Sequence, residues 1–553
     1  MINNTKDKGR VDFTLSFDSI IDQLILLIVV ISLILFILYP IIMVISTSFF
    51  SKGNLTLDNY RNLLNYRNLK LIKNSLFVVS ISSILSTFFS CCIALFAFTQ
   101  REKISRTIYR GLMLSMISPP FVSSLALITL FGRRGIITHN LLGLSVNPYG
   151  WQGIVLLQTL GHIPLSSIML ISALNSIDRR QILASKDLGA DTLETLKNVI
   201  IPAIFPAILS TLFLSFTMNL ADFGTPIIIG GKFKMLATET YMTIFSSGDL
   251  GKAASMSVLL IPPALLAFWF YRKNLIEIDN KSTGTKPIGN EDYNFELPVW
   301  LKAILSVITI SFFIIVMLKY GSILLSALSI NSSGKLRFTL KHIDEVKFSY
   351  IPAFIRSIVF AIIAGVVSSI LGILLSYYTH RRKIKGMKYI EFISALPYII
   401  PGIFFGLGYI VGFNKEPLIL TGTTAIVVLN STFRHISVAN KATNAAFTTI
   451  DTRIEDAARD LGASKIRTII DIVFPLLKPV FLTSFINTFT ACMTTVGAII
   501  FLVSPKNVVA SIVMFKNIQN GGYGPAAVMA SILIIITVSV NLIAIRLLNK
   551  REV

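Results

Sequence analysis

The sequence predicts an all-α integral membrane protein with about twelve transmembrane helices in two parallel six-helix repeats. Composition, long apolar runs and an internal duplication support this class. Of 553 residues, 53% are hydrophobic and only 14% charged, whereas soluble domains contain about 25% charged residues. The net charge of +22 resides mostly in short loops between apolar runs, which indicates a membrane topology rather than nucleic-acid binding.

Twelve apolar runs approach or exceed the ~20 residues needed to cross ~30 Å of hydrocarbon as helix. In the first half they cover residues 24–49, 75–98, 111–131, 153–173, 200–220 and 256–271. In the second half they cover residues 300–327, 357–378, 390–413, 423–438, 474–496 and 526–548. A polar stretch without a small-residue cleavage site precedes the first run, so we expect a retained helix rather than a signal peptide.

The distribution of Lys and Arg predicts that both termini are cytoplasmic. With this orientation, basic loops such as 100–110 and 380–388 lie on the cytoplasmic side of the membrane. Loop 51–74 is also basic but lies on the outer side. The three cysteines lie within apolar runs, so we expect neither a disulfide scaffold nor a thiolate metal site. No metal site is predicted elsewhere.

The second half repeats the first. Ser75 matches Ser357 at a spacing of 282 residues, and from the fourth run onward the spacing falls to 273, as for His162 and His435. A loop that is shorter by nine residues in the second half explains the difference. An even number of helices per half makes the repeat parallel, with its axis along the membrane normal. We therefore expect one permease half at 1–272, a cytoplasmic linker at 273–298 and another half at 299–553.

A long cytoplasmic loop between the fourth and fifth runs is the best-matched segment of the two halves, at 174–202 and 447–475. Asp178 with Gln181, and Thr452 with Glu455, are typical of capping boxes that begin a short helix. A glycine in each loop predicts that the helix ends in a left-handed conformation. Small residues on the helix allow close approach to another surface, and a proline marks the start of the next span. These residues are Ala184, Ser185, Gly189 and Pro202 in the first half, and Ala457, Ala458, Gly462 and Pro475 in the second.

This loop resembles the EAA loop of ABC importer permeases. The second copy, with Asp456 before Ala457 and Ala458, keeps the family spacing with Asp in place of Glu, whereas the first has Leu183 in place of the acid. The resemblance implies a type I ABC importer fold in the bacterial inner membrane. It also implies that the loops dock onto two copies of a cytoplasmic ATPase that uses ATP, while this chain binds no cofactor and is not an enzyme. The chain has no phosphate-binding loop of its own.

The fused layout resembles permeases of ferric-iron importers, a group that is also similar to thiamine and 2-aminoethylphosphonate permeases. The segments that favour iron are 57–60, 221–226, 238–241, 494–497 and 501–505. The resemblance implies that an extracytoplasmic binding protein delivers the substrate. Thiamine and 2-aminoethylphosphonate are the alternative substrates.

Ionisable and hydroxyl groups within or near the spans are candidates for the translocation pathway. Alternatives remain open: Asp222 could cap a helix, the histidines could be neutral hydrogen-bonding residues, and Arg434 could form a structural pair or extend to the interface. A secondary transporter with parallel repeats is the hypothesis from another class, but it would need coupling charges at mid-membrane. The candidates are Asp222, His162, His435, Arg434, Thr494 and Thr495.

Overall fold

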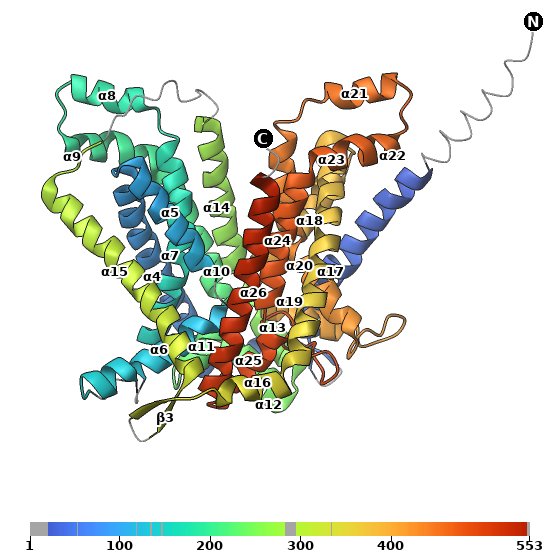
Figure 1. Ribbon diagram of the computed structural model, residues 1–553. Coiled ribbons are helices and arrows are strands. Elements are labelled where there is room, and N and C mark those ends of the chain that lie inside the picture. Colours follow the sequence, from blue (N-terminus) through green and yellow to red (C-terminus); the bar gives the residue numbers. More distant parts are fainter. Residues whose placement is uncertain are drawn as a thin grey trace, which may run out of the picture. The chain divides into compact units, whose positions relative to one another are not determined.

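The computed structural model describes residues 20–51, 54–117, 119–132, 135–144, 147–282, 295–332 and 335–549. These residues are mostly helical, with antiparallel hairpins β1–β2 (Phe50–Ser51 and Asn54–Leu55) and β3–β4 (Ser329–Ser332 and Lys335–Phe338) (Figure 1). The chain forms two compact units. The first-half unit comprises Ser48–Tyr350 and Val513–Ile534, and the second-half unit comprises Met1–Thr47, Ile351–Ile512 and Ile535–Val553.

These units differ from the sequence halves because each contains the first helix of the other half. The helix Ile20–Ser48 belongs almost entirely to the second-half unit, where its η1 turn (Ile34–Leu38) packs against α18 and α20. Helix α15 (Val299–Leu328) belongs to the first-half unit and packs against α4 and α6. An apolar helix needs a packing partner, and in both cases the partner lies outside the helix's own repeat.

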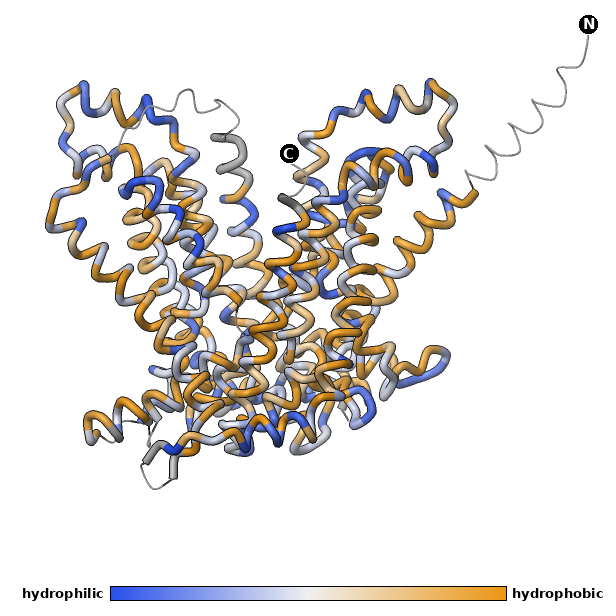
Figure 2. Tube along the Cα trace, viewed as in Figure 1, coloured by the Kyte–Doolittle hydropathy of each residue, from blue (hydrophilic) through white to orange (hydrophobic). Residues whose placement is uncertain are grey.

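The first-half unit is built around α4, which packs along α7 and α10. Its α8–α9 loop lies at one end, and α12, α16 and the β3–β4 hairpin lie at the opposite end (Figure 1). Apolar residues cover α15 over most of its length (Figure 2). Besides α15, the helices of this unit are α3 (Asp58–Leu63), α4 (Tyr66–Phe98), α5 (Glu102–Met116), α6 (Pro120–Phe131), η2 (Ile136–Leu141), α7 (Trp151–Asn175), α8 (Arg179–Asp187), α9 (Thr192–Thr195), η3 (Leu196–Ile200), α10 (Ile201–Ala221), α11 (Gly224–Ile229), α12 (Leu236–Ser247), α13 (Leu250–Val258), α14 (Ile261–Ser282) and α16 (Lys341–Ser349).

The second-half unit repeats this packing, with α17 along α20 and α24. Its elements are α2 (Tyr39–Ser48), α17 (Ile351–Ser376), η4 (Tyr377–Arg381), α18 (Met387–Ile399), α19 (Gly402–Gly412), α20 (Thr424–Phe447), α21 (Arg453–Asp460), α22 (Lys465–Arg467), η5 (Thr468–Val473), α23 (Phe474–Leu476) and α24 (Lys478–Thr494). Two further helices, α25 (Ala510–Gln519) and α26 (Tyr523–Asn549), each contribute residues to both units.

Among the described residues, nine helices are long and apolar enough to cross a membrane, or eleven if each of two bent pairs is one span. One bent pair is α18 and α19, which meet at 113° beside Pro401. Proline cannot donate a helical hydrogen bond, and it forces the preceding residue, Ile400, into an extended conformation. The predicted span 423–438 lies on α20, which has sufficient length but is too polar to be counted.

The linker predicted at 273–298 is partly helical, because α14 continues to Ser282. Residues 283–294 of that linker lie outside the described residues.

Candidate functional site

The first of the two matched loops is a short helix, α8, followed by a tight turn. Asp178 begins the helix, with its Oδ1 accepting a hydrogen bond from the Arg180 backbone N–H at 3.0 Å. The turn follows at Gly189, whose φ of +87° is the predicted left-handed conformation. Ser185 Oγ lies 3.0 Å from Thr195 Oγ1, which joins α8 to α9, whereas Ala184 is exposed.

The chain then returns to the core through α9, η3 and α10. A capping box joins Asp191 and Glu194 at the start of α9, with hydrogen bonds of 2.6 and 3.0 Å. Pro202 lies in the first turn of α10, as predicted, but the helical backbone is continuous from Thr192 to Ala221 through α9 and η3, so the proline does not begin the helix.

The second loop has the same form. Helix α21 is followed by Gly462, with a φ of +84°. Ala457 and Asp456 are exposed and Ala458 is buried. Pro475 lies in the short helix α23, and the main part of the next span, α24, begins at Lys478 after a bend of 68°.

The predicted capping box of the second loop is wrong in detail. Asp451, rather than Thr452, caps α21, with its Oδ1 accepting from the Arg453 backbone N–H at 2.9 Å. Glu455 does not fold back toward Thr452, because an arginine of another helix binds its carboxylate.

That arginine is Arg381, at the end of η4. Its Nε donates to Glu455 Oε1 at 2.6 Å, and both side chains are only 7% exposed. Its Nη1 and Nη2 donate to the carbonyl oxygens of Ile450 and Asp451, at 2.8 and 3.0 Å. The guanidinium also lies over the ring of Phe447, 5.3 Å from its centroid. One side chain therefore holds the start of α21 against the end of the α17–η4 helix.

The first loop lacks this ion pair. At the repeat spacings of 273 and 282, Glu455 corresponds to Ile182 and Arg381 to Thr99. Ile182 is 1% exposed and belongs to an apolar cluster with Ile93, Leu112 and Leu174. The first loop is thus fixed to its unit by apolar packing, and the second by buried charge.

Both loops present a leucine to the outside at the turn. Leu188 is 88% exposed and Leu461 is 89% exposed. The two residues occupy equivalent positions directly before Gly189 and Gly462. The same exposure of an apolar side chain therefore recurs at equivalent positions of both repeats.

Two of the candidate pathway residues, Asp222 and His162, line a cavity of about 540 Å³ in the first-half unit. Asp222 Oδ1 accepts from the Thr225 backbone N–H at 3.1 Å, and Oδ2 accepts from Gln158 Nε2 at 3.2 Å. Asp222 thus binds a backbone amide in the turn between α10 and α11. Lys319 of α15 lines the same cavity.

Sequence reasoning missed Lys319 and the pairing of Glu455 with Arg381. Lys319 lies inside the run 300–327, far from Lys302 at its start, and a basic residue so deep in an apolar segment was the available signal. The Arg381–Glu455 pair had no such signal, because its two residues lie 74 positions apart.

The other four pathway candidates belong to the second-half unit. Arg434 packs against Gly402, where an added Cβ would clash with its guanidinium. Among the described residues, Arg434 Nη1 and His435 Nε2 have no hydrogen-bond partner. Thr494 Oγ1 and Thr495 Oγ1 donate to carbonyl oxygens of their own helix, at 3.0 and 2.7 Å.

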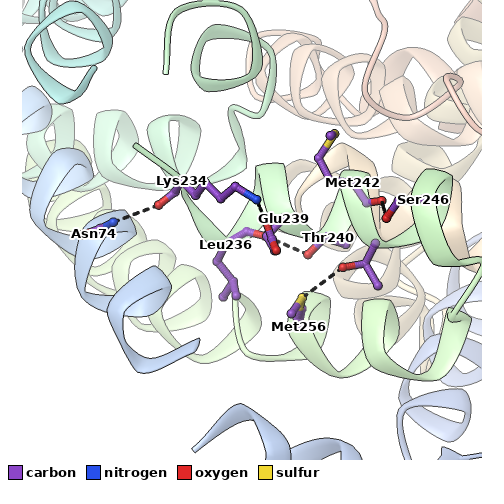
Figure 3. A network of polar contacts seen from close by, with 9 residues as sticks. Asn74, Lys234, Leu236, Glu239, Thr240, Met242, Ser246 and Met256 are labelled. Atoms are coloured by element: carbon purple, nitrogen blue, oxygen red, sulfur yellow. Dashed lines mark hydrogen bonds and ion pairs between the residues drawn. The ribbon is translucent and has the colours of Figure 1, made fainter. Parts of the chain in front are cut away.

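The segment 238–241, which is one of those that resemble ferric-iron permeases, takes part in a polar network on α12 (Figure 3). Glu239 accepts an ion-pair hydrogen bond from Lys234 Nζ at 2.9 Å, and the Lys234 carbonyl accepts from Asn74 Nδ2 at 3.0 Å. Beside it, Ser75 Oγ accepts from the Leu236 backbone N–H at 2.8 Å. The network thus fixes α12 to the start of the long helix α4.

The second-half unit contains a similar joint. Ser357 Oγ accepts from the Ala510 backbone N–H, also at 2.8 Å, which fixes the start of α25 to α17.

Comparison with known proteins identifies the relatives of this fold. Residues 86–274 and 368–552 each match the family described as binding-protein-dependent transport system inner membrane component. The ferric transport system permease protein FbpB of Actinobacillus pleuropneumoniae is 29% identical over 94% of this chain and 77% of its own. A putative ferric transport system permease protein FbpB 1 of Haemophilus influenzae is 30% identical over 87% of this chain and 77% of its own.

More distant relatives match about half of the chain. A putative 2-aminoethylphosphonate transport system permease protein PhnV of Salmonella choleraesuis is 26% identical over 44% of this chain and 94% of its own. One family match covers most of each repeat, and each match contains one of the two loops. The chain therefore belongs to the family of binding-protein-dependent transport system inner membrane components, and it is a fused two-half permease of an ABC transporter.

Proposed function

We propose that this permease imports ferric iron, which an extracytoplasmic binding protein delivers, across the bacterial inner membrane. Two copies of a separate cytoplasmic ATPase hydrolyse the ATP, and both termini of the permease are cytoplasmic. The names of the relatives that cover most of the chain support iron as the substrate. The matched pair of loops, each with an exposed leucine before a left-handed glycine, supports the ATPase contact.

The loops have the form that a coupling contact needs. Each is a short helix held firmly to its own unit on one side and exposed on the other. A force applied to α8 or α21 therefore reaches the adjoining spans through α9–η3 or through Arg381. The exposed Ala184 and Ala457 allow a partner surface to approach the helix closely.

The polar groups of the described pathway candidates support transient passage rather than tight binding. Fe³⁺ favours several oxygen ligands, yet Asp222 already accepts two hydrogen bonds within the protein. We infer that the binding protein supplies the affinity for iron, and that the permease supplies a path.

Deletion of the gene tests the substrate. Growth on limiting ferric iron should fail and should recover when the gene is restored, whereas growth on thiamine or on 2-aminoethylphosphonate as sole phosphorus source should be unchanged. Loss of growth only on the aminophosphonate, with normal uptake of radioactive iron, would replace the iron assignment by that of the more distant relatives. Copurification of the ATPase with the permease tests the proposed contact between these two proteins.

A further inference from the structure

The first helix of each repeat belongs to the unit of the other repeat, and its start is joined there to that unit's loop. In the second-half unit, Asp22 lies in the first turn of the helix Ile20–Ser48 and is only 3% exposed. Arg382 Nη1 donates to both of its carboxylate oxygens, at 2.8 and 2.6 Å. Arg382 directly follows Arg381, which binds Glu455 of α21. Two adjacent arginines therefore connect the loop and the first helix to the same turn of backbone.

The first-half unit makes the same connection with apolar groups. Phe295 and Leu297, just before α15, are 2% and 7% exposed and belong to the apolar cluster that contains Ile182 of α8. Lys186 Nζ of α8 lies over the Phe295 ring, 5.7 Å from its centroid. The sequence repeats this Phe-x-Leu pattern at residues 13–15, outside the described residues, at the repeat spacing of 282. Each first helix is thus joined to a loop in the manner of that loop's own attachment, by charge in one unit and by apolar packing in the other.

Farther along, each first helix contacts a short helix that is equivalent in the two repeats. In the second-half unit, the Tyr409 hydroxyl of α19 donates to the Phe36 carbonyl oxygen of the first helix at 2.8 Å. In the first-half unit, Thr129 Oγ1 of α6 lies 3.2 Å from Ser326 Oγ of α15. Helices α6 and α19 correspond at the spacing of 282. A continuous helix therefore runs from the loop of each unit to α6 or α19.

We propose that each first helix is a lever that transmits ATPase-driven movement of a loop to α6 or α19 of the same unit. Arg382 and Phe295 are the positioning residues at the loop end of the two levers. This inference rests on the proposed docking of the ATPase. Coupling over such distances is carried by packed side chains and rigid helices. The repeats thereby act crosswise, because the first loop moves the first helix of the second half, and the second loop moves the first helix of the first half.

Distances between spin labels in the complex with the ATPase test whether loop and helix move together. Cysteines that replace Gln23 and Arg453, in a background without the native cysteines, carry labels on the first helix and on α21. Arg180 and Lys302 serve in the same way for α8 and α15, and all of these side chains are exposed. Each distance should be the same in the nucleotide-free and the vanadate-trapped complex, because each pair lies on one moving body. A wild-type distance that differs between the two states would overturn the proposal.

Substitution of Asp22 tests whether the connection transmits work. Asp22→Asn keeps the shape of the side chain, and Arg382, which is 21% exposed, can turn to water, so the protein should fold. Binding of the ATPase and hydrolysis of ATP should persist, while iron uptake per ATP should fall by at least about twofold. The distance between the labels on the first helix and α21 should become broad. Lys385→Gln removes an exposed charge from the loop after η4 and should keep the wild-type uptake per ATP.

The corresponding change in the first-half unit is Phe295→Ala, with Phe295→Leu, which keeps an apolar side chain, as its control. The alanine variant should lose uptake per ATP in the same way, and the leucine variant should retain most of it. Wild-type uptake per ATP in both Asp22→Asn and Phe295→Ala would show that the first helices transmit nothing. A wild-type permease that neither binds the ATPase nor takes up iron would instead refute the proposed function.

Discussion

Arg381 and Glu455 form a buried ion pair, with Nε and Oε1 2.6 Å apart, that fixes the second loop to the helix before it. The equivalent residues of the first repeat, Thr99 and Ile182, carry no charge. A single guanidinium that also binds two carbonyl oxygens at the start of α21 holds the loop in one orientation. The two loops of this permease thus differ in the interaction that connects them to the spans.

The first prediction concerns this ion pair. Arg381→Gln should destabilise the second-half unit by ~3–5 kcal/mol, because it leaves the Glu455 carboxylate buried without its partner. Thermal unfolding should occur at lower temperature, and ATP-driven uptake should fall relative to ATP hydrolysis. Arg453→Gln is the matched control: its pair with Asp451 is exposed (88% and 48%), so the cost should be ~0–1 kcal/mol. Equal effects of the two substitutions would show that burial of the pair is unimportant.

A second prediction asks whether apolar packing can replace the pair. The double substitution Arg381→Thr with Glu455→Ile gives the second repeat the residues of the first. It should be less destabilising than Arg381→Thr alone, because no buried charge is left unpaired. Unfolding temperatures of the two single variants and the double variant give the coupling energy. A double variant that loses as much as the sum of the singles would contradict this view.

The third prediction concerns the two left-handed glycines. Gly189→Val and Gly462→Val should each strain the turn by ~1–2 kcal/mol, because φ values of +87° and +84° disfavour a side chain. An added Cβ meets no atom within 4 Å at either position, so the protein should fold while binding of the ATPase weakens. Gly321→Val is a control, since its Cβ also meets nothing but its backbone is helical. Wild-type ATPase copurification and uptake in both loop variants would refute the docking role.

The fourth prediction is that Asp456→Ala impairs transport more than Leu183→Ala. Asp456 is an exposed acid in the first turn of α21, where the helix dipole favours negative charge by ~0.3–1 kcal/mol and where a partner can donate to it. Leu183 is its apolar counterpart and is partly buried. Rates of ATP-driven uptake in the two variants decide the matter, and equal losses would show that the acid has no special role.

The fifth prediction is that purified permease without its binding protein holds no iron tightly. Chelation and elemental analysis after exposure to ferric citrate should find far less than one iron per chain. Stoichiometric iron that survives gel filtration, and that is lost in Asp222→Asn, would mean that the permease itself binds the metal.

Much of the fold was determined by the sequence alone. Apolar length predicts the spans, because only a helix satisfies its own backbone hydrogen bonds in hydrocarbon. The duplication predicts two similar loops, and the structure confirms the left-handed conformations of Gly189 and Gly462. These features depend on the conformation of neighbouring residues or on the repeat, and both can be recognised from the sequence.

Contacts between distant segments were decided only by the tertiary structure. No local pattern distinguishes a Glu455 that caps its own helix from one that binds Arg381, because the choice depends on which side of α21 faces η4. The exchange of the first helices between units likewise depends on which apolar surface each helix meets. Lys319 and Asp222 lie 97 positions apart in the sequence, and only the packing of α15 beside α6 places them around one cavity.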